Sequence, residues 1–250
     1  MTVTFLGTGT STGVPVIGCN CATCMSTDPR DKRLRASVLL KDDNHCILID
    51  SGPDFRQQAL KAGINHLDAI LVTHLHYDHI GGLDDVRPLG DTDVYADSIS
   101  QEAIHRCLPY CFGPHPYPGS PRLTLHDIED GKPIKIGTWD ILPLRVMHGK
   151  LPILGFRIGD FAYLTDVKSI PESTMERLKG LDTLVINGLR HEPHPAHLSI
   201  EEAVELAKEI GAKHTYLTHF AHTAKPHATL EHILPQNIRP AYDGLTLDIK

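Results

Sequence analysis

Residues 69–83 read "AILVTHLHYDHIGGL" and decide how the rest of the chain is interpreted. A five-residue apolar run, typical of a buried strand, is followed at once by His74, His76, Asp78 and His79. Four such groups in so small a space would repel one another or lose hydrogen bonds unless a cation held them. A polar turn with chance histidines is the alternative, and the density of the motif argues against it. The stretch therefore predicts a metal site where a strand ends at a sheet edge.

The composition around this stretch is that of a globular protein. The chain has 250 residues, of which 41% are hydrophobic and 22% are charged, without a linker-like shift or a low-complexity tract. We therefore expect a single domain over residues 1–250 with one large core. The 24 basic and 31 acidic residues give a net charge of −7, which provides no general footprint for a nucleic-acid polymer.

Hydrophobic periodicity predicts short strands in two groups, with helices after each group. The fold class expected is α/β, with two sheets packed together and helices outside. Strands are expected at 2–6, 36–40, 46–50, 68–73, 93–96, 122–128, 132–136, 138–147, 154–159, 161–165, 183–187, 214–218 and 245–250. Helices are expected at 54–63, 97–108, 171–180, 199–211 and near 228–234, with Ser199 and Glu202 forming a capping box.

The HxHxDH pattern of residues 74–79 resembles the signature of the metallo-β-lactamase superfamily, whose hydrolases bind two metals in a four-layer αββα sandwich. The resemblance implies further ligands after later strands. "PLRVMHG" supplies His148, "FAYLTDV" supplies Asp166 and "TYLTHF" supplies His219. It also implies that Asp50, in "ILIDSGPD", is a hydrogen-bond partner behind the ligands.

The resemblance implies two divalent cations, Mn²⁺ or Zn²⁺, at this centre. One would be held by His74, His76 and His148, the other by Asp78, His79 and His219, with Asp166 bridging both. Related flavodiiron redox proteins carry glutamate at the position of His76, so histidine here favours hydrolytic chemistry.

A second metal motif lies at residues 18–24, "GCNCATC". The thiolates of Cys19, Cys21 and Cys24 favour zinc, and a fourth ligand would close a structural tetrahedron. From the residues alone the fourth ligand is open, with His45, Cys46 and several other histidines as candidates. Three thiols without a metal are the alternative.

A closer resemblance, to the cyclic phosphodiesterase of the phosphonate-degrading (carbon–phosphorus lyase) pathway, narrows the choice of fourth ligand. That enzyme has a structural zinc held by an early CxCxxC and by a histidine three residues after the last active-site histidine. In this chain that position is His222, in "LTHFAH". The resemblance thus implies one structural Zn²⁺ beside the catalytic metals.

The stretch "RHEPHPAHLS", residues 190–199, offers His191, His194 and His197 before a capped helix. Phosphodiester cleavage benefits from a proton donor to the leaving oxygen. By resemblance to tRNA 3′-processing endonucleases and to the phosphonate-pathway enzyme, His197 is that acid, while the other two are read as solvated loop residues. Asp78 and His197 are the predicted catalytic residues.

Other features carry weaker expectations. Residues 109–122, with five prolines, are predicted to form a long loop or a lid over the substrate. Cys107 and Cys111 are expected on one helix face in the core, and Cys46 inside a buried strand.

The function predicted is that of a binuclear metal-dependent phosphodiesterase acting on a small or cyclic phosphate ester. The alternatives are a tRNA 3′-processing nuclease, a thioester, lactone or β-lactam hydrolase, and a non-catalytic metal- or RNA-binding scaffold. The absence of a basic arm and the acidic charge disfavour nucleic acid. Without an export signal or an apolar span, we expect a cytoplasmic protein and no membrane partner. Oligomeric state leaves no mark in the sequence, and a homodimer stays open.

Overall fold

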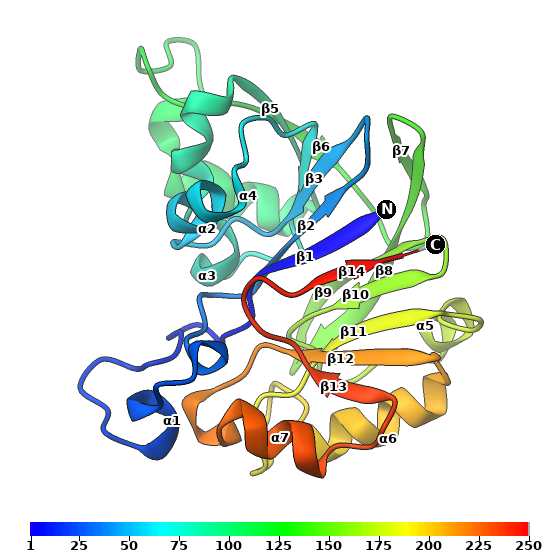
Figure 1. The fold of residues 1–250 in the computed structure, drawn as a ribbon. Helices are drawn as coiled ribbons and strands as arrows, with labels where there is room; N and C mark the ends of the chain where they lie inside the picture. The colour runs from blue at the N-terminus through cyan, green and yellow to red at the C-terminus, as the bar shows by residue number, and fades with distance from the viewer. Residues whose placement is uncertain (250) are drawn as a thin grey trace.

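The computed structural model describes residues 1–249, which form two seven-stranded mixed sheets packed face to face with helices outside them (Figure 1). The first sheet has the order β14-β1-β2-β3-β4-β5-β6 and the second the order β13-β12-β11-β10-β9-β8-β7. The predicted α/β sandwich of four layers is confirmed.

The bounds of the first sheet are β1 Thr2–Gly7, β2 Ser37–Lys41, β3 Cys46–Ile49, β4 Ala69–Leu71, β5 Asp91–Ala96, β6 Arg122–Asp127 and β14 Thr246–Asp248. The second comprises β7 Ile134–Ile136, β8 Trp139–His148, β9 Leu151–Ile158, β10 Phe161–Leu164, β11 Thr183–Asn187, β12 His214–Thr218 and β13 Ile238–Pro240. The α-helices are α1 Ala22–Met25, α2 Phe55–Ala62, α3 Tyr77–Ile80, α4 Ser98–Cys107, α5 Glu172–Arg177, α6 Ile200–Ile210 and α7 His227–Ile233. Short 3₁₀ turns span Pro29–Asp31, Leu83–Leu89, Pro109–Cys111 and His222–Ala224.

The strand directions bring the ends of several strands to one edge of the sandwich. In the first sheet β3, β4, β5 and β6 run parallel to one another, and in the second sheet β10, β11, β12 and β13 do so. Because parallel strands end at the same edge, the residues that follow them can gather there.

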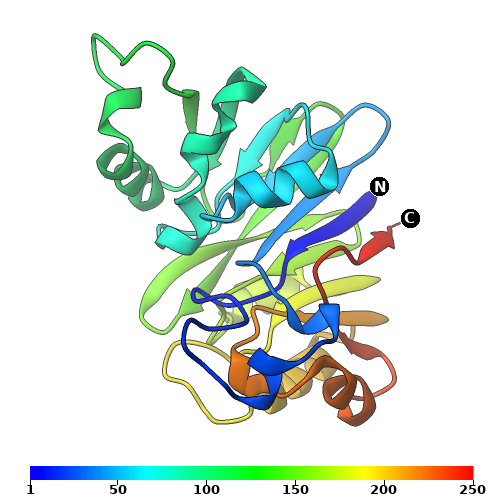
Figure 2. The same ribbon diagram turned by 60° about the vertical axis from the view of Figure 1, so that its left-hand side comes forward.

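The central core lies between the two sheets and is built from fully buried apolar residues such as Phe5, Ile49, Phe156 and Val185. The helices α2 and α4 cover the outer face of the first sheet, and α6 and α7 cover that of the second (Figures 1 and 2). Ser199 and Glu202 form the predicted capping box, which satisfies backbone groups at the start of α6.

The differences from the expected elements are small. The strand expected at 245–250 is shorter, and Lys250 lies outside the described residues. The strand β13 was not expected, because three residues carry too little pattern. The prediction that Cys107 is a core residue is wrong: it is exposed at the end of α4, while Cys111 is buried in the following 3₁₀ turn. Across residues 1–249, every helix is too short or too polar to cross a bilayer.

Candidate metal centre

The structure gathers all seven predicted ligands at one edge of the sandwich. His74, Asp166 and His219 follow β4, β10 and β12, and His148 is the last residue of β8. Their ligand atoms form overlapping groups in which all atoms lie within 4.8 Å of one another. The groups that carry the predicted pattern are His74, His76 and His148; His74, His79 and Asp166; and Asp78, His79 and His219.

Hydrogen bonds orient the first group of histidines toward a common point. His148 donates from Nδ1 to the carbonyl oxygen of Ala196 at 2.7 Å, which leaves Nε2 as an acceptor. His74 Nδ1 lies 3.0 Å from the Thr73 hydroxyl, and His74 Nε2 lies 3.0 Å from His76 Nδ1. Burial lowers the pKa of His74 and of His76, so both rings are neutral at pH 7, the form that binds metals.

The second group surrounds the predicted bridging carboxylate. Asp166 Oδ2 lies 3.2 Å from His79 Nε2, and its other oxygen lies 3.2 Å from His219 Nε2. Asp78 Oδ2 is 3.2 Å from the same nitrogen of His79. Although burial alone would raise the pKa of Asp166, the neighbouring imidazoles of His219 and His79 hold that pKa well below its usual range.

The donor set fits a bound cation. Within residues 1–249, the buried Nε2 atoms of His79 and His219 have no hydrogen-bond partner of good geometry, although carboxylate oxygens lie nearby. Buried polar atoms are rarely left without a partner. Nitrogen lone pairs and carboxylate oxygens that converge without satisfying one another are the arrangement expected of ligands to divalent ions.

Asp50 supports this centre from behind, as the resemblance implied. Its fully buried carboxylate accepts hydrogen bonds from the Thr73 amide and hydroxyl, both at 2.8 Å, and lies 2.7 Å from His79 Nδ1. The contact to Nδ1 orients the ring and leaves His79 Nε2 facing the cluster.

Backbone conformation is strained where three site residues sit. Asp50, Asp166 and His219 have φ values of 62°, 58° and 60°, in the left-handed region that non-glycine residues seldom adopt. Such strain concentrates at functional sites. The strand pattern carries no signal for these backbone conformations.

Two glycines allow the loops that carry Asp50 and Asp78 to touch. A Cβ on Gly52 would lie 2.1 Å from the carbonyl oxygen of Asp78, and one on Gly82 would lie 2.0 Å from the carbonyl oxygen of Gly52. Only glycine fits at this backbone-to-backbone contact.

His197 lies beside the carboxylate of Asp166. Its Nδ1 is 3.4 Å from Asp166 Oδ1, and its ring packs against those of His148 and His219 with centroids 4.5 and 5.1 Å away. Burial lowers the pKa of His197 to about 3. Its ligand atom also groups with those of His148 and Asp166.

His191 and His194, the other histidines of this loop, differ in their distance from the predicted ligands. His191 lies 2.6 Å from Glu201, away from the ligand groups, whereas the ring centroid of His194 is 4.9 Å from that of His197.

The three cysteines gather around His222. Cys19 Sγ and Cys21 Sγ lie 3.2 and 3.4 Å from His222 Nδ1, and Cys24 belongs to the same four-residue group. A hydrogen bond from the Cys24 amide and the nearby His222 lower the pKa of Cys21 to about 6, which favours the thiolate. Figure 2 shows the loop carrying α1 close to the segment before α7. The open candidates His45 and Cys46 lie elsewhere, on the β2–β3 hairpin.

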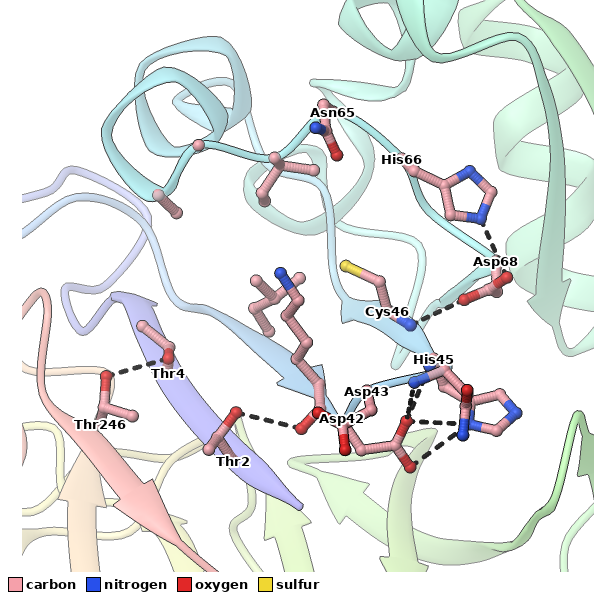
Figure 3. Close-up of a pocket in the computed structure, with 16 residues that line it drawn as sticks. Thr2, Thr4, Asp42, Asp43, His45, Cys46, Asn65, His66, Asp68 and Thr246 are labelled. Atoms are coloured by element: carbon pink, nitrogen blue, oxygen red, sulfur yellow. Dashed lines mark hydrogen bonds and ion pairs between the residues drawn. The ribbon is translucent and has the colours of Figure 1, made fainter.

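That hairpin lines a separate cavity of about 420 Å³, shown in Figure 3. Two ion pairs line it, His45 with Asp42 and His66 with Asp68, each at 3.0 Å. Among the described residues that line it, none belongs to either predicted metal site. Cys46 lies at its wall, half-buried at the start of β3, and not wholly in the core as expected.

The predicted lid, residues 109–122, contacts the 3₁₀ turn that follows the residues of the HxHxDH motif. The Tyr110 hydroxyl donates to Asp84 at 2.7 Å, in the 3₁₀ turn after Gly82. A cover over the substrate stays a prediction.

A model of the β-lactamase superfamily domain matches residues 45–220. The chain belongs to the metallo-β-lactamase superfamily. It is also similar to a solved structure described as a new diphosphatase from the PhnP family, with 43% identity, a TM-score of 0.93, and coverage of 100% of this chain and 98% of that one. The chain is therefore a PhnP-like member of this superfamily.

Two curated relatives extend the comparison. A Porphyromonas gingivalis protein named octanoyltransferase is 47% identical over 245 residues, which are 96% of this chain and 50% of the relative. A ribonuclease Z of Mycobacterium sp. (strain KMS) is 26% identical over 259 residues, or 87% of this chain and 83% of the relative. The chain thus spans only half the length of the first of these proteins.

Proposed function

We propose that this protein is a binuclear phosphodiesterase that hydrolyses small phosphate diesters, with diphosphate diesters included in its substrate class. The observation that carries the proposal is the position of His197, 3.4 Å from the carboxylate that faces both ligand groups. A proton donor next to a binuclear centre suits displacement of an alkoxide or phosphate leaving group.

The residues that would hold two divalent ions are His74, His76 and His148 for one, Asp78, His79 and His219 for the other, with Asp166 between them. When bound, a pair of such ions lowers the pKa of water to near neutral and stabilises the attacking and leaving oxygens. Zn²⁺ or Mn²⁺ suits this mixed imidazole and carboxylate set. We assign a structural Zn²⁺ to the four-residue group of Cys19, Cys21, Cys24 and His222.

His197 would gain its proton when substrate binds. With a pKa of about 3, lowered by burial, the free side chain is neutral at pH 7. An anionic phosphate beside the ring raises its pKa, because a nearby negative charge favours the imidazolium. The imidazolium then donates its proton to the leaving oxygen, and the neutral ring is restored.

The PhnP-family diphosphatase supports the cleavage of a bond at phosphorus, and the ribonuclease Z relative supports diester chemistry. The net charge of −7 favours a small substrate over a nucleic-acid polymer. The octanoyltransferase name belongs to a protein of which the chain matches only 50%, so it gives little support to an acyl substrate.

The test is hydrolysis by metal-stripped protein reloaded with Mn²⁺ or Zn²⁺. The substrates are bis(p-nitrophenyl) phosphate, a dinucleoside diphosphate, p-nitrophenyl phosphate, an octanoyl thioester and a precursor tRNA. We expect metal-dependent cleavage of the diester, the diphosphate or both. Turnover confined to the thioester or to the tRNA would overturn the proposal in favour of the corresponding alternative.

A further inference from the structure

A single short turn, residues 218–222, supplies ligands to both predicted metal sites. His219 faces Asp166 in the binuclear group, and His222 faces the cysteines. Between them Phe220 is almost fully buried, with 1% of its surface exposed. The position of this turn therefore affects both sites at once.

The turn is held by the segment that directly follows β1. The Phe220 amide donates to the Thr8 carbonyl at 2.9 Å, and the Thr10 amide donates to the Phe220 carbonyl at 3.0 Å. These bonds fix the backbone on one side, next to the strained φ of 60° at His219. The other constraint on the turn is the packing of the Phe220 ring.

The group under the ring is a buried cation. The guanidinium carbon of Arg33 lies 4.5 Å from the centroid of Phe220, and Arg33 is only 3% exposed. Its Nη1 donates to the Thr8 hydroxyl at 2.8 Å and to the carbonyl oxygen of Ala241 at 2.6 Å. The Thr8 hydroxyl in turn donates to Asp243 at 2.7 Å. A desolvated cation over an aromatic face is a strong form of this contact.

The backbone around Arg33 also contacts the loop that leads into Cys19, Cys21 and Cys24. Its amide donates to the Val14 carbonyl at 2.7 Å, and the Val14 amide donates to the Arg33 carbonyl at 2.8 Å. The neighbouring Lys32 ammonium donates to the Cys24 carbonyl at 3.1 Å. The segment around Arg33 thus contacts the turn that carries His219 and the loop that carries the thiolates.

We propose that Arg33 is a positioning residue that sets the ligand geometry of His219 through Phe220, and so tunes the affinity of one metal of the binuclear pair. The inference rests on the proposed metal sites, but not on the identity of the substrate. It predicts an asymmetric effect, because His74, His76 and His148 belong to other elements.

The test measures metal affinity in competition with a chromophoric chelator, without any substrate. Reference variants His76→Ala and His219→Ala assign the two active-site affinities. In Arg33→Met we expect the affinity at the His219 group to fall 10- to 100-fold, the size of effect seen when supporting residues are lost. The affinity at the His76 group should change less than threefold.

Two further variants keep the test decisive if Arg33→Met does not fold. Arg33→Met combined with Asp243→Asn removes both buried charges together, and Phe220→Leu removes the aromatic face while keeping every charge. Each should show the same selective loss. Arg30→Met, whose side chain is one-third exposed and paired with Asp28, is the matched control and should leave both affinities unchanged.

Folded variants with both affinities within threefold of wild type would overturn the role of Arg33. An equal loss at both groups would also overturn it, because it would show a general structural effect. The outcome is independent of turnover: if the wild-type protein binds metals but cleaves no diester, the proposed function fails and this inference still stands or falls on the affinities.

Discussion

His197 is buried beside the carboxylate of Asp166, and burial lowers its pKa to about 3. The ring is 9% exposed and stacks on His219, so packing against protein side chains fixes its orientation. A side chain held this way can transfer a proton with little reorganisation.

The substitution His197→Ala should retain both active-site metals and lower kcat on a diester by roughly 10²- to 10⁴-fold, the usual contribution of a general acid. Metal content by atomic emission and steady-state kinetics measure the two quantities. His191→Ala is the control, since His191 pairs with Glu201. Loss of a metal together with activity would instead make His197 a ligand.

Asp50 orients the predicted ligand His79, and its substitution tests how much this contact contributes to metal affinity. In Asp50→Asn the buried contact to His79 Nδ1 is weakened, so the ring is oriented less firmly. We expect metal affinity to fall about 10- to 100-fold. The checking measurement is chelator competition, with exposed Asp43→Asn as the control; unchanged affinity would show that the Asp50 contact is dispensable.

At this scale the dense cluster at residues 74–79 pointed to a metal site, and the family resemblance implied His148, Asp166 and His219 as further ligands. The ends of strands that meet at one edge of the sandwich bring these residues together. It could not identify the left-handed conformations of Asp50, Asp166 and His219, because those depend on loop contacts made far along the chain. The role of Arg33 was likewise invisible: its partners Phe220 and Ala241 lie near the other end of the sequence.

Among the elements, α7 is anchored by a buried polar junction. His227 begins the helix, its amide donates to Asp31 at 2.7 Å, and its Nδ1 lies 3.2 Å from the Arg33 guanidinium. Burial and the positive charge of Arg33 lower the pKa of His227 to about 4. The side chain is therefore neutral in the folded protein well below its ordinary titration range.

This junction predicts a specific acid sensitivity. Between pH 6.5 and 4 the unfolded chain protonates His227 and the folded chain does not, so its contribution to stability is present above pH 6.5 and is lost as the pH falls through that window. The stability difference between wild type and His227→Gln should therefore shrink by on the order of 2–3 kcal/mol from pH 7.5 to pH 4.5.

Urea unfolding of both proteins at the two pH values measures this difference. The other titrating groups are common to the two proteins and cancel. A constant difference across the range would contradict the low pKa of His227.

Periodicity predicted most elements, including α6 with its capping box. It was least informative for short pieces: α3 spans four residues and β13 three, and both are fixed by tertiary contacts. Local pattern cannot specify elements of that length.

For the whole molecule, the cysteine group ties an early loop to a late turn. The substitution Cys21→Ala should remove one zinc per chain and lower the melting temperature by several degrees, because a bound metal stabilises only the folded state. Exposed Cys107→Ala is the matched control. Unchanged zinc content and melting temperature would show that the thiols do not hold a metal.

The α/β layers followed from the grouping of strands and helices, but the sheet orders did not. The strand β14 pairs with β1 at the opposite end of the chain, and the sequence carries no local signal for that pairing.

The separation of Cys21 from His222 has a consequence for biosynthesis. The two residues are 201 positions apart, so at roughly 5–20 residues per second the thiols leave the ribosome about 10–40 s before their imidazole partner is made. During that interval the nascent loop is an incomplete chelator, exposed to oxidants and to competing ions. If this group holds the proposed zinc, the site can be completed only after His222 is made, so metal binding would be one of the last events of folding.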